Sequence, residues 1–185
     1  MKKSFIPLYF IVVFLISLAW HTPLVAQPAA DKGPYARINL IPERDHVNAG
    51  DIIFIAIEQD IAPGWHTYWV NPGDSGEPLR IKWDLPEGFE AGDIKWPVPE
   101  KMTIGEFISY GYKDKATLLQ PLTIPADIPE GPITLTADIT VLVCEEICIP
   151  EISHHELTLN GTAEPVDNSA YIDEAYNSLP MDIPL

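Results

Sequence analysis

An apolar side chain at every second position between residues 133 and 143 is the feature that most limits what this chain can fold into. The apolar positions are Ile133, Leu135, Ala137, Ile139, Val141 and Val143. Because successive side chains of a β-strand point to opposite faces, this period of two predicts a strand with one buried face. Residues 79–85 repeat the pattern, and residues 51–57 are apolar on both faces, which predicts a fully buried strand.

Turn residues separate these runs, and the 19 prolines and 11 glycines argue against a helical bundle. Four further strands are predicted, at residues 35–41, 65–70, 118–124 and 156–159. Pro121 lacks an N–H group, so it places its strand at a sheet edge or at a bulge. The pattern as a whole predicts an all-β fold, an immunoglobulin-like antiparallel β-sandwich.

Length and charge exclude several classes of protein. A chain of 185 residues corresponds to about one domain. Its formal net charge of -16 excludes a nucleic-acid binder that works through a basic surface, because phosphates need Lys and Arg partners. The hydrophobic content of 46% is too high for an acidic disordered chain, and two cysteines are too few for a disulfide-dense scaffold.

The first 26 residues predict a secretory signal peptide, with cleavage after Ala26. Lys2 and Lys3 supply the positive charges, and an apolar stretch follows them. That stretch leaves an uncleaved anchor as the alternative, since it is slightly shorter than a membrane span. We expect a leader at 27–34, a folded domain at 35–162, and a tail at 163–185 with a short helix within 169–179. The style of the signal favours the periplasm of a bacterium.

The two cysteines lie four positions apart, as Cys144 and Cys148, at the end of the predicted strand 133–143. Cys144 shares its parity with the polar side chains of that strand, so we expect it to point away from the core. The spacing permits a disulfide across a turn, which closes a loop too small to stabilise the fold much. An exposed disulfide of this kind is suited to exchange, and Glu145 and Glu146 should raise the pKa of a nearby thiol.

Two other interpretations of the cysteines stay open at this point. The disulfide could be a structural clip in an adaptor domain whose exposed sheet edges bind a partner. Cys144, Cys148, His154 and His155 could also bind copper or zinc. However, the two histidines are adjacent on a predicted strand and should face opposite ways, so no metal is expected. His66, beside Trp65, could be a ligand or a proton donor, but we expect it to be a surface histidine.

Four longer motifs resemble a known family. They are PGWHTYWVNPGDSGEP (63–78), WDLPEGFEAGDIKWPVPE (83–100), SYGY (109–112) and VLVCEEICIPE (141–151). In this order they resemble the N-terminal periplasmic domain of the thiol:disulfide interchange protein DsbD, and most of all its ScsB-like variant. The resemblance extends from about Ile38 to Leu159.

The resemblance implies an immunoglobulin-like domain with one redox-active cysteine pair and no cofactor. Cys148 would form the mixed disulfide with partners, and Cys144 would resolve it. A cap around Phe107–Tyr112 would cover the pair, with Phe107 or Tyr110 shielding it and Tyr68 beside it. If the chain is an enzyme, it would then be a protein-disulfide reductase.

The partners implied are proteins rather than nucleic acids or small molecules. A membrane-embedded or thioredoxin-like donor would supply electrons, and a thioredoxin-fold protein of the periplasm would accept them. Such acceptors serve disulfide isomerisation or cytochrome c maturation. This sequence departs from the best-known members in its closer cysteines and in Ser109, which stands where they have an aromatic residue. The sequence shows no further domain after the tail, so we expect the donor to be a separate protein.

Overall fold

The computed structural model describes residues 33–180, which form ten strands and one helix. Their order along the chain is β1 (Ala36–Pro42), β2 (Ile52–Ile61), β3 (Thr67–Gly73), β4 (Arg80–Asp84), β5 (Glu90–Ala91), β6 (Glu100–Ile104), β7 (Phe107–Tyr112), β8 (Lys115–Thr123), β9 (Ile133–Cys144), β10 (Cys148–Leu159) and α2 (Ser169–Asn177). The predicted signal peptide, its cleavage site and most of the leader lie outside the described residues. Within 33–180, no helix is both long and apolar enough to cross a membrane.

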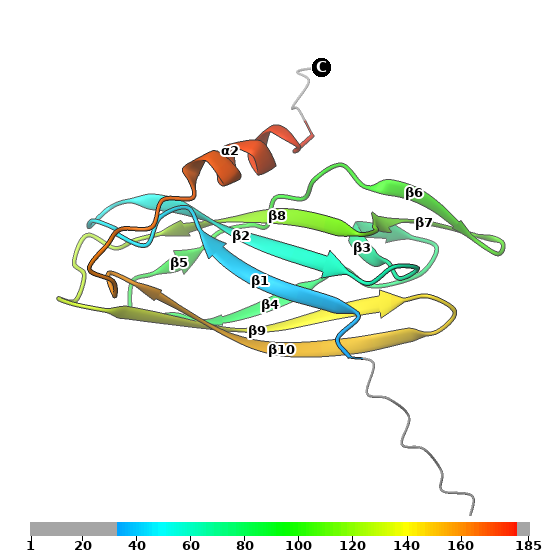
Figure 1. Cartoon of the computed structure of the whole chain (residues 1–185), viewed down its shortest axis with the longest axis horizontal. Coiled ribbons are helices and arrows are strands. Elements are labelled where there is room, and N and C mark those ends of the chain that lie inside the picture. Colours follow the sequence, from blue (N-terminus) through cyan, green and yellow to red (C-terminus); the bar gives the residue numbers. More distant parts are fainter. Residues whose placement is uncertain (1–32, 181–185) are drawn as a thin grey trace, which may run out of the picture. The chain divides into compact units, whose positions relative to one another are not determined.

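The strands form three antiparallel sheets (Figure 1). Their strand orders are β1-β2-β8-β5, β10-β9-β4 and β3-β7-β6. The third sheet is joined to the second by a bridge between His66 and Cys144, in which each N–H donates to the other residue's carbonyl at 2.9 Å. The predicted all-β, immunoglobulin-like antiparallel fold is confirmed.

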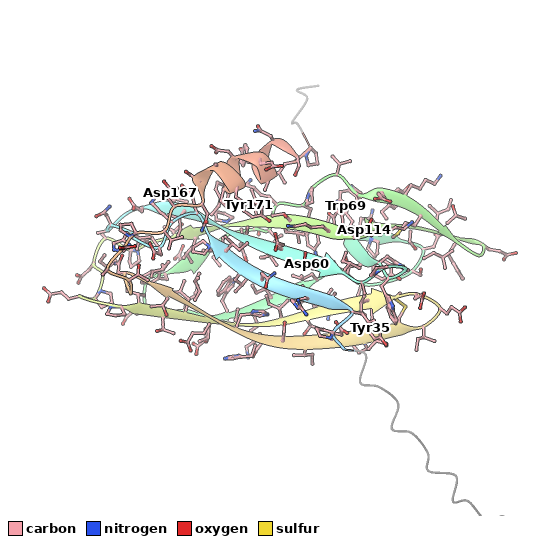
Figure 2. All side chains as sticks on the ribbon, in the orientation of Figure 1. Tyr35, Asp60, Trp69, Asp114, Asp167 and Tyr171 are labelled. Carbon is pink, nitrogen blue, oxygen red and sulfur yellow. A yellow bond between two sulfur atoms is a disulfide. The ribbon has the colours of Figure 1, made fainter. Side chains whose placement is uncertain are left out.

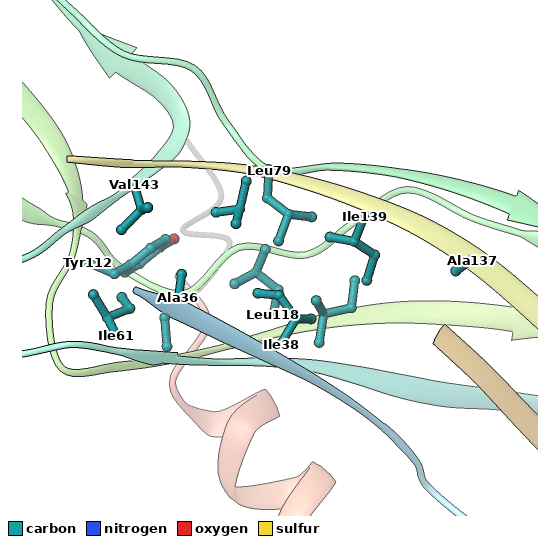
Figure 3. Close-up of a cluster of buried hydrophobic side chains, with 12 residues drawn as sticks. Ala36, Ile38, Ile61, Leu79, Tyr112, Leu118, Ala137, Ile139 and Val143 are labelled. Atoms are coloured by element: carbon teal, nitrogen blue, oxygen red, sulfur yellow. The ribbon is translucent and has the colours of Figure 1, made fainter. Parts of the chain in front are cut away.

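The hydrophobic core lies between the first and second sheets (Figure 3). All six apolar positions predicted on the strand 133–143 belong to it, because β9 presents alternate side chains to β2 and β8. Burial of each such Ile, Leu or Val contributes roughly 1.5–3 kcal/mol. This core fixes the position of β9 and therefore of Cys144 at its end.

A second layer of packing covers the outer face of the first sheet. Ile172 and Ala175 of α2 pack against Ala56 of β2 and Leu119 of β8. Figure 1 shows α2 lying across these strands. β2 is thus covered on both faces, as the apolar sequence of residues 51–57 predicts.

The prediction of an edge or bulge at Pro121 is wrong. β8 is an inner strand, and Pro121 pairs with Phe54 of β2 in an unbroken register. The carbonyl of Pro121 accepts a hydrogen bond from Gly92, just after β5 ends at Ala91. In an antiparallel sheet, the N–H and C=O groups of one residue face the same neighbouring strand. The missing N–H of Pro121 therefore faces β5, which pairs with β8 over only two residues. The pairing of β8 with β2 loses no hydrogen bond.

Candidate functional site

The two cysteines form a disulfide between the last residue of β9 and the first residue of β10. Cys144 and Cys148 are direct partners in the register of these strands, with their Cα atoms 4.1 Å apart and their sulfur atoms 2.08 Å apart. Three residues connect them, and within this turn the N–H of Glu145 donates to the carbonyl of Ile147 at 3.1 Å. The pair therefore sits at a hairpin turn whose strands are already held together by backbone hydrogen bonds.

The two halves of the disulfide differ in exposure. Cys144 is 2% exposed, while Cys148 is exposed, as are the three turn residues before it. Cys144 lies outside the core clusters, on the parity opposite to Val143, in agreement with the prediction that it points away from the core. The prediction of an exposed disulfide is correct for Cys148 only, because the third sheet covers Cys144.

Tyr68 of β3 is the residue that covers Cys144. Its hydroxyl oxygen lies 3.1 Å from Cys144 Sγ and 3.9 Å from Cys148 Sγ. A disulfide sulfur carries no hydrogen, so the tyrosine hydroxyl is the donor. Tyr68 is buried, and among the predicted shielding residues it is the one that hydrogen-bonds the pair within 33–180.

His66 continues this contact away from the sulfur atoms. Its Nε2 lies 3.1 Å from the Tyr68 hydroxyl oxygen, and its ring meets the tyrosine ring edge-on at a centroid distance of 5.2 Å. The single hydroxyl hydrogen of Tyr68 points to Cys144, so the histidine Nε2–H donates to the hydroxyl oxygen. The expectation of a surface histidine is wrong, since His66 is only 6% exposed.

Burial sets the protonation of both aromatic partners. It lowers the pKa of His66, with a smaller contribution from the positive charge of Lys113. It also raises the pKa of the Tyr68 hydroxyl, against a smaller lowering by a hydrogen bond with Ser75. Both side chains are therefore neutral near pH 7, and the hydrogen-bond chain ends at Cys144 with a neutral donor.

The segment NPGDSG holds Tyr68 from its other side. Gly76 has φ of +100°, and a Cβ there would lie 2.2 Å from the Tyr68 ring. Asp74 exchanges two hydrogen bonds with Ile108 of β7, through its N–H and through its carboxylate, at 2.9 and 2.8 Å. The hydroxyls of Ser75 and Ser109 lie 3.0 Å apart. The segment thus links β3 to β7 by hydrogen bonds, and its Gly76 packs closely against the Tyr68 ring that contacts the disulfide.

The predicted cap forms β7, the second strand of the β6–β7 hairpin. Phe107 pairs with Ile104 at the end of this hairpin, and its side chain is 55% exposed. Tyr110 packs edge-on against Trp69 of β3 at a centroid distance of 6.5 Å. Figure 1 shows the hairpin and the β9–β10 turn at the same end of the sheets. A shielding role for Phe107 and Tyr110 remains a prediction.

Glu151, three residues after Cys148, fastens the first strand to this end of the sandwich. Its two carboxylate oxygens accept hydrogen bonds from the N–H groups of Tyr35 and Ala36 at 2.7 and 3.0 Å. The ring of Tyr35, labelled in Figure 2, stacks on Trp65 at 3.8 Å between centroids. Trp65, just before His66, therefore packs on Tyr35, and Glu151 of β10 binds the backbone N–H of Tyr35.

The histidines considered as metal ligands have other partners. His154 lies 2.9 Å from a carboxylate oxygen of Asp138, and His155 lies 2.7 Å from the hydroxyl of Ser153. Among residues 33–180, no group of three His, Cys, Asp or Glu side chains is arranged to hold a metal ion.

One family of known proteins matches this sequence over most of the described residues. Residues 39–160 match the family described as the N-terminal part of the thiol:disulfide interchange protein DsbD. The solved N-terminal periplasmic domain of ScsB from Proteus mirabilis is similar, with a TM-score of 0.61 and 20% identity over 83% of this chain. The alignment spans 57% of the ScsB chain.

A second solved structure is more distant. The N-terminal domain of DsbD from Neisseria meningitidis, in its reduced form, has a TM-score of 0.42 and 19% identity, and the match covers 66% of this chain and 86% of that one. No curated protein matches this sequence significantly. The likeness to ScsB concerns the fold.

Proposed function

The chain belongs to the family of the N-terminal domain of the thiol:disulfide interchange protein DsbD, and from this we propose that it relays electrons between proteins through Cys144 and Cys148. The observation that carries the proposal is the asymmetry of the pair. Cys148 is exposed at the start of β10, whereas Cys144 is buried beneath Tyr68. An incoming thiolate thus has access to one sulfur atom, which supports directed exchange rather than a static clip.

The proposed reaction is two successive thiol-disulfide exchanges. A thiolate of the donor attacks Cys148 Sγ, the bond to Cys144 breaks, and Cys144 leaves with the electron pair as a thiolate. A second donor thiolate then attacks the donor sulfur of this mixed disulfide and releases Cys148. The donor is oxidised to a disulfide, and Cys144 and Cys148 take up two protons as they become thiols.

The same steps deliver the electrons in reverse order. The Cys148 thiolate attacks the acceptor disulfide, and the acceptor's leaving sulfur departs as a thiolate. Cys144, as a thiolate, then attacks Cys148 Sγ, which restores the Cys144–Cys148 bond and releases the reduced acceptor. The attack needs in-line access and a stable leaving thiolate, so residues of this chain suffice for it.

We place the reaction in the periplasm, with a membrane-embedded or thioredoxin-like donor and a thioredoxin-fold acceptor that serves disulfide isomerisation or cytochrome c maturation. The predicted signal peptide supports this, as does a disulfide, which persists in oxidising compartments. The related ScsB domain is described as periplasmic. The exposed apolar side chains of Ile147 and Phe107 at this end suit contact with another protein.

The reduction potential of the full chain tests the exchange role against the adaptor with a structural disulfide. The protein is equilibrated in glutathione redox buffers, and free thiols are trapped with a maleimide. We expect a potential above roughly −250 mV, within the range of exchange proteins. A value below about −300 mV is that of an inert structural disulfide and would contradict the proposal.

A matched pair of variants tests the roles of the two sulfur atoms. Cys144→Ser leaves the exposed Cys148 free, and we expect it to accumulate a mixed disulfide with an oxidised thioredoxin-fold protein. Cys148→Ser leaves only the buried Cys144 and should trap far less. Equal trapping, or more by Cys148→Ser, would show that the attacking cysteine is wrongly assigned.

A further inference from the structure

A chain of two hydrogen-bond donors ends on one sulfur atom of the disulfide. His66 Nε2 lies 3.1 Å from the Tyr68 hydroxyl oxygen, and that oxygen lies 3.1 Å from Cys144 Sγ but 3.9 Å from Cys148 Sγ. All three linked side chains are buried. Their backbones are registered by the paired hydrogen bonds between His66 and Cys144. The backbone hydrogen bonds between His66 and Cys144 therefore place the tyrosine hydroxyl nearer to Cys144 than to Cys148.

We propose that Tyr68 stabilises Cys144 as a thiolate, and that His66 is the positioning residue that keeps the tyrosine hydroxyl aimed at this sulfur. The inference rests on the proposed function, because it names the group that receives the negative charge during exchange. Tyr68 contacts a reacting atom and is a catalytic residue in this sense. His66 acts only through Tyr68.

The movement of electrons in the first exchange shows where the hydrogen bond from Tyr68 acts. When a donor thiolate bonds to Cys148, the electron pair of the broken bond moves to Cys144. A hydrogen bond from Tyr68 to a neutral disulfide sulfur is weak, but the same bond to a thiolate is charge-assisted and stronger. Stabilisation thus grows as the charge develops, which favours Cys144 over Cys148 as the leaving sulfur. In the closing step the same contact keeps Cys144 ionised for attack.

The role of His66 follows from the chemistry of a hydroxyl group. A tyrosine hydroxyl has one hydrogen and can rotate it between two in-plane directions. With the histidine N–H on the oxygen's lone pair, the hydrogen is directed to Cys144. A donated hydrogen bond also makes the hydroxyl a better donor in turn, because linked hydrogen bonds polarise one another.

Three charged residues bear on these hydrogen bonds. Glu145 and Glu146 follow Cys144 in the β9–β10 turn, and their negative charges disfavour a nearby thiolate. The third is Lys113, between β7 and β8. Lys113 also acts on His66, whose pKa is lowered first by burial and then by this charge. The imidazole is therefore neutral near pH 7, and the stabilisation of Cys144 does not require a protonated histidine.

The pKa of Cys144 tests the proposal. The full chain carries Cys148→Ser, so that one thiol remains, and the ultraviolet absorbance of the thiolate is followed against pH. We expect Tyr68→Phe to raise the pKa of Cys144 by about one unit, as the loss of a hydrogen bond to a charged group implies. His66→Leu should raise it by about half a unit, and His66→Gln, which keeps an N–H donor, should restore most of the original value.

A double variant separates positioning from a merely structural effect. If His66 acts through Tyr68, His66→Leu changes nothing further once Tyr68→Phe is present. The matched control is His154→Leu, an exposed histidine of β10 that is bound to Asp138, and it should leave the pKa unchanged. Thermal unfolding of every variant verifies that it is folded.

Two results would overturn the inference. One is a folded Tyr68→Phe protein in which the pKa of Cys144 is unchanged. The other is a shift by His66→Leu that is equally large without the tyrosine hydroxyl. The titration needs no partner protein, so its outcome is independent of the trapping and potential measurements. A pair that exchanges poorly but keeps the Tyr68 effect would contradict the proposed function alone.

Discussion

Gly76 decides how closely the backbone approaches the ring that contacts the disulfide. Its φ of +100° lies in the region that favours glycine, and a Cβ would come within 2.2 Å of Tyr68. Gly131 has a similar φ of +86° but has no atom within 4 Å of its Cβ position. The two glycines share a backbone conformation that would strain any other residue, and they differ in what an added methyl group would meet.

At the residue scale we therefore predict different outcomes for the same substitution. Gly131→Ala should destabilise the chain by about 1 kcal/mol, from backbone strain alone. Gly76→Ala should destabilise it by about 3 kcal/mol, because the methyl group also overpacks the Tyr68 ring. Urea unfolding of the two variants measures the difference. Equal losses would show that the contact with Tyr68 yields without strain.

The residues of the site differ in how visible they are in the sequence. Cys144 and Cys148 stand out by spacing, and parity alone places Cys144 away from the core. Tyr68 came from the family resemblance. The sequence singles out His66 as a possible ligand or proton donor but favours a surface position, although His66 shares its parity with Tyr68 two positions on. What places both beside Cys144 is the long-range bridge between His66 and Cys144, and no local pattern encodes that bridge.

At the scale of elements, a hydrogen bond to the buried carboxylate of Glu58 adds to the apolar packing that holds α2 on the first sheet. Tyr171, labelled beneath α2 in Figure 2, donates a hydrogen bond to the carboxylate of Glu58 and lies 3.0 Å from the hydroxyl of Thr117. Burial opposes ionisation of Glu58, but hydrogen bonds from Lys115, Tyr171 and Asn39 outweigh it and hold its pKa below the usual value. Tyr171 thus supplies one of the hydrogen bonds to the buried, charged carboxylate of Glu58.

We predict that Tyr171→Phe destabilises the chain by about 1.5–3 kcal/mol, the range for a hydrogen bond to a charged group. The control on the same helix is Tyr176→Phe, whose ring packs near Phe54 and is 51% exposed. It should change stability by less than about 0.5 kcal/mol. Both are measured by urea unfolding at pH 7. A larger loss at Tyr176 than at Tyr171 would mean that the hydrogen bond from Tyr171 to Glu58 is not what fixes the helix.

The elements that the sequence predicted are those with a regular pattern. β9 and β2 follow directly from their apolar positions, because one face or both faces meet the core. β10 was predicted only from residue 156 onward. Its outward side chains stay exposed along its length, and its pairing with β9, not its own pattern, defines it. β6 was also missed, since a short hairpin takes its register from neighbouring strands.

At the scale of the whole molecule, acid should weaken the attachment of the segment that leads to α2. Asp45 is buried and accepts hydrogen bonds from Thr162 at 2.6 Å and from the N–H of Val166 at 2.8 Å. The bonds from Thr162, His46 and Val166, in this order, lower its pKa from 3.8 to about 2. The folded state therefore binds this proton more weakly than the unfolded state does.

The sign of the pH dependence follows from this depressed pKa. The stabilisation by Asp45 is complete above the unfolded pKa of 3.8 and is lost as the pH falls towards 2. It amounts to about 2 kcal/mol. Asp45→Asn should unfold with a flatter dependence on pH across this range, while Asp173→Asn, at an exposed position of α2, should follow the parent protein. Parallel curves for Asp45→Asn and the parent would contradict the assignment.

The fold class of the whole molecule was predictable, and the arrangement of its sheets was not. Period-two patterns indicate strands and their buried faces, which is enough for a sandwich. They do not indicate that β3, β7 and β6 form a separate sheet joined to the second through the bridge at His66. That junction encloses Cys144, so the burial of one half of the pair could not be inferred from the sequence.

Cys144 and Cys148 face each other as the last rung of a ladder that runs along the whole of β9 and β10. Breaking the bond between their sulfur atoms frees no loop, because the backbone of both strands stays paired beyond it. We therefore expect the backbone around the pair to keep its outline when the disulfide is reduced. In the proposed exchange, a partner would then meet the same backbone surface in both oxidation states, and the difference between the states would lie in the two sulfur atoms.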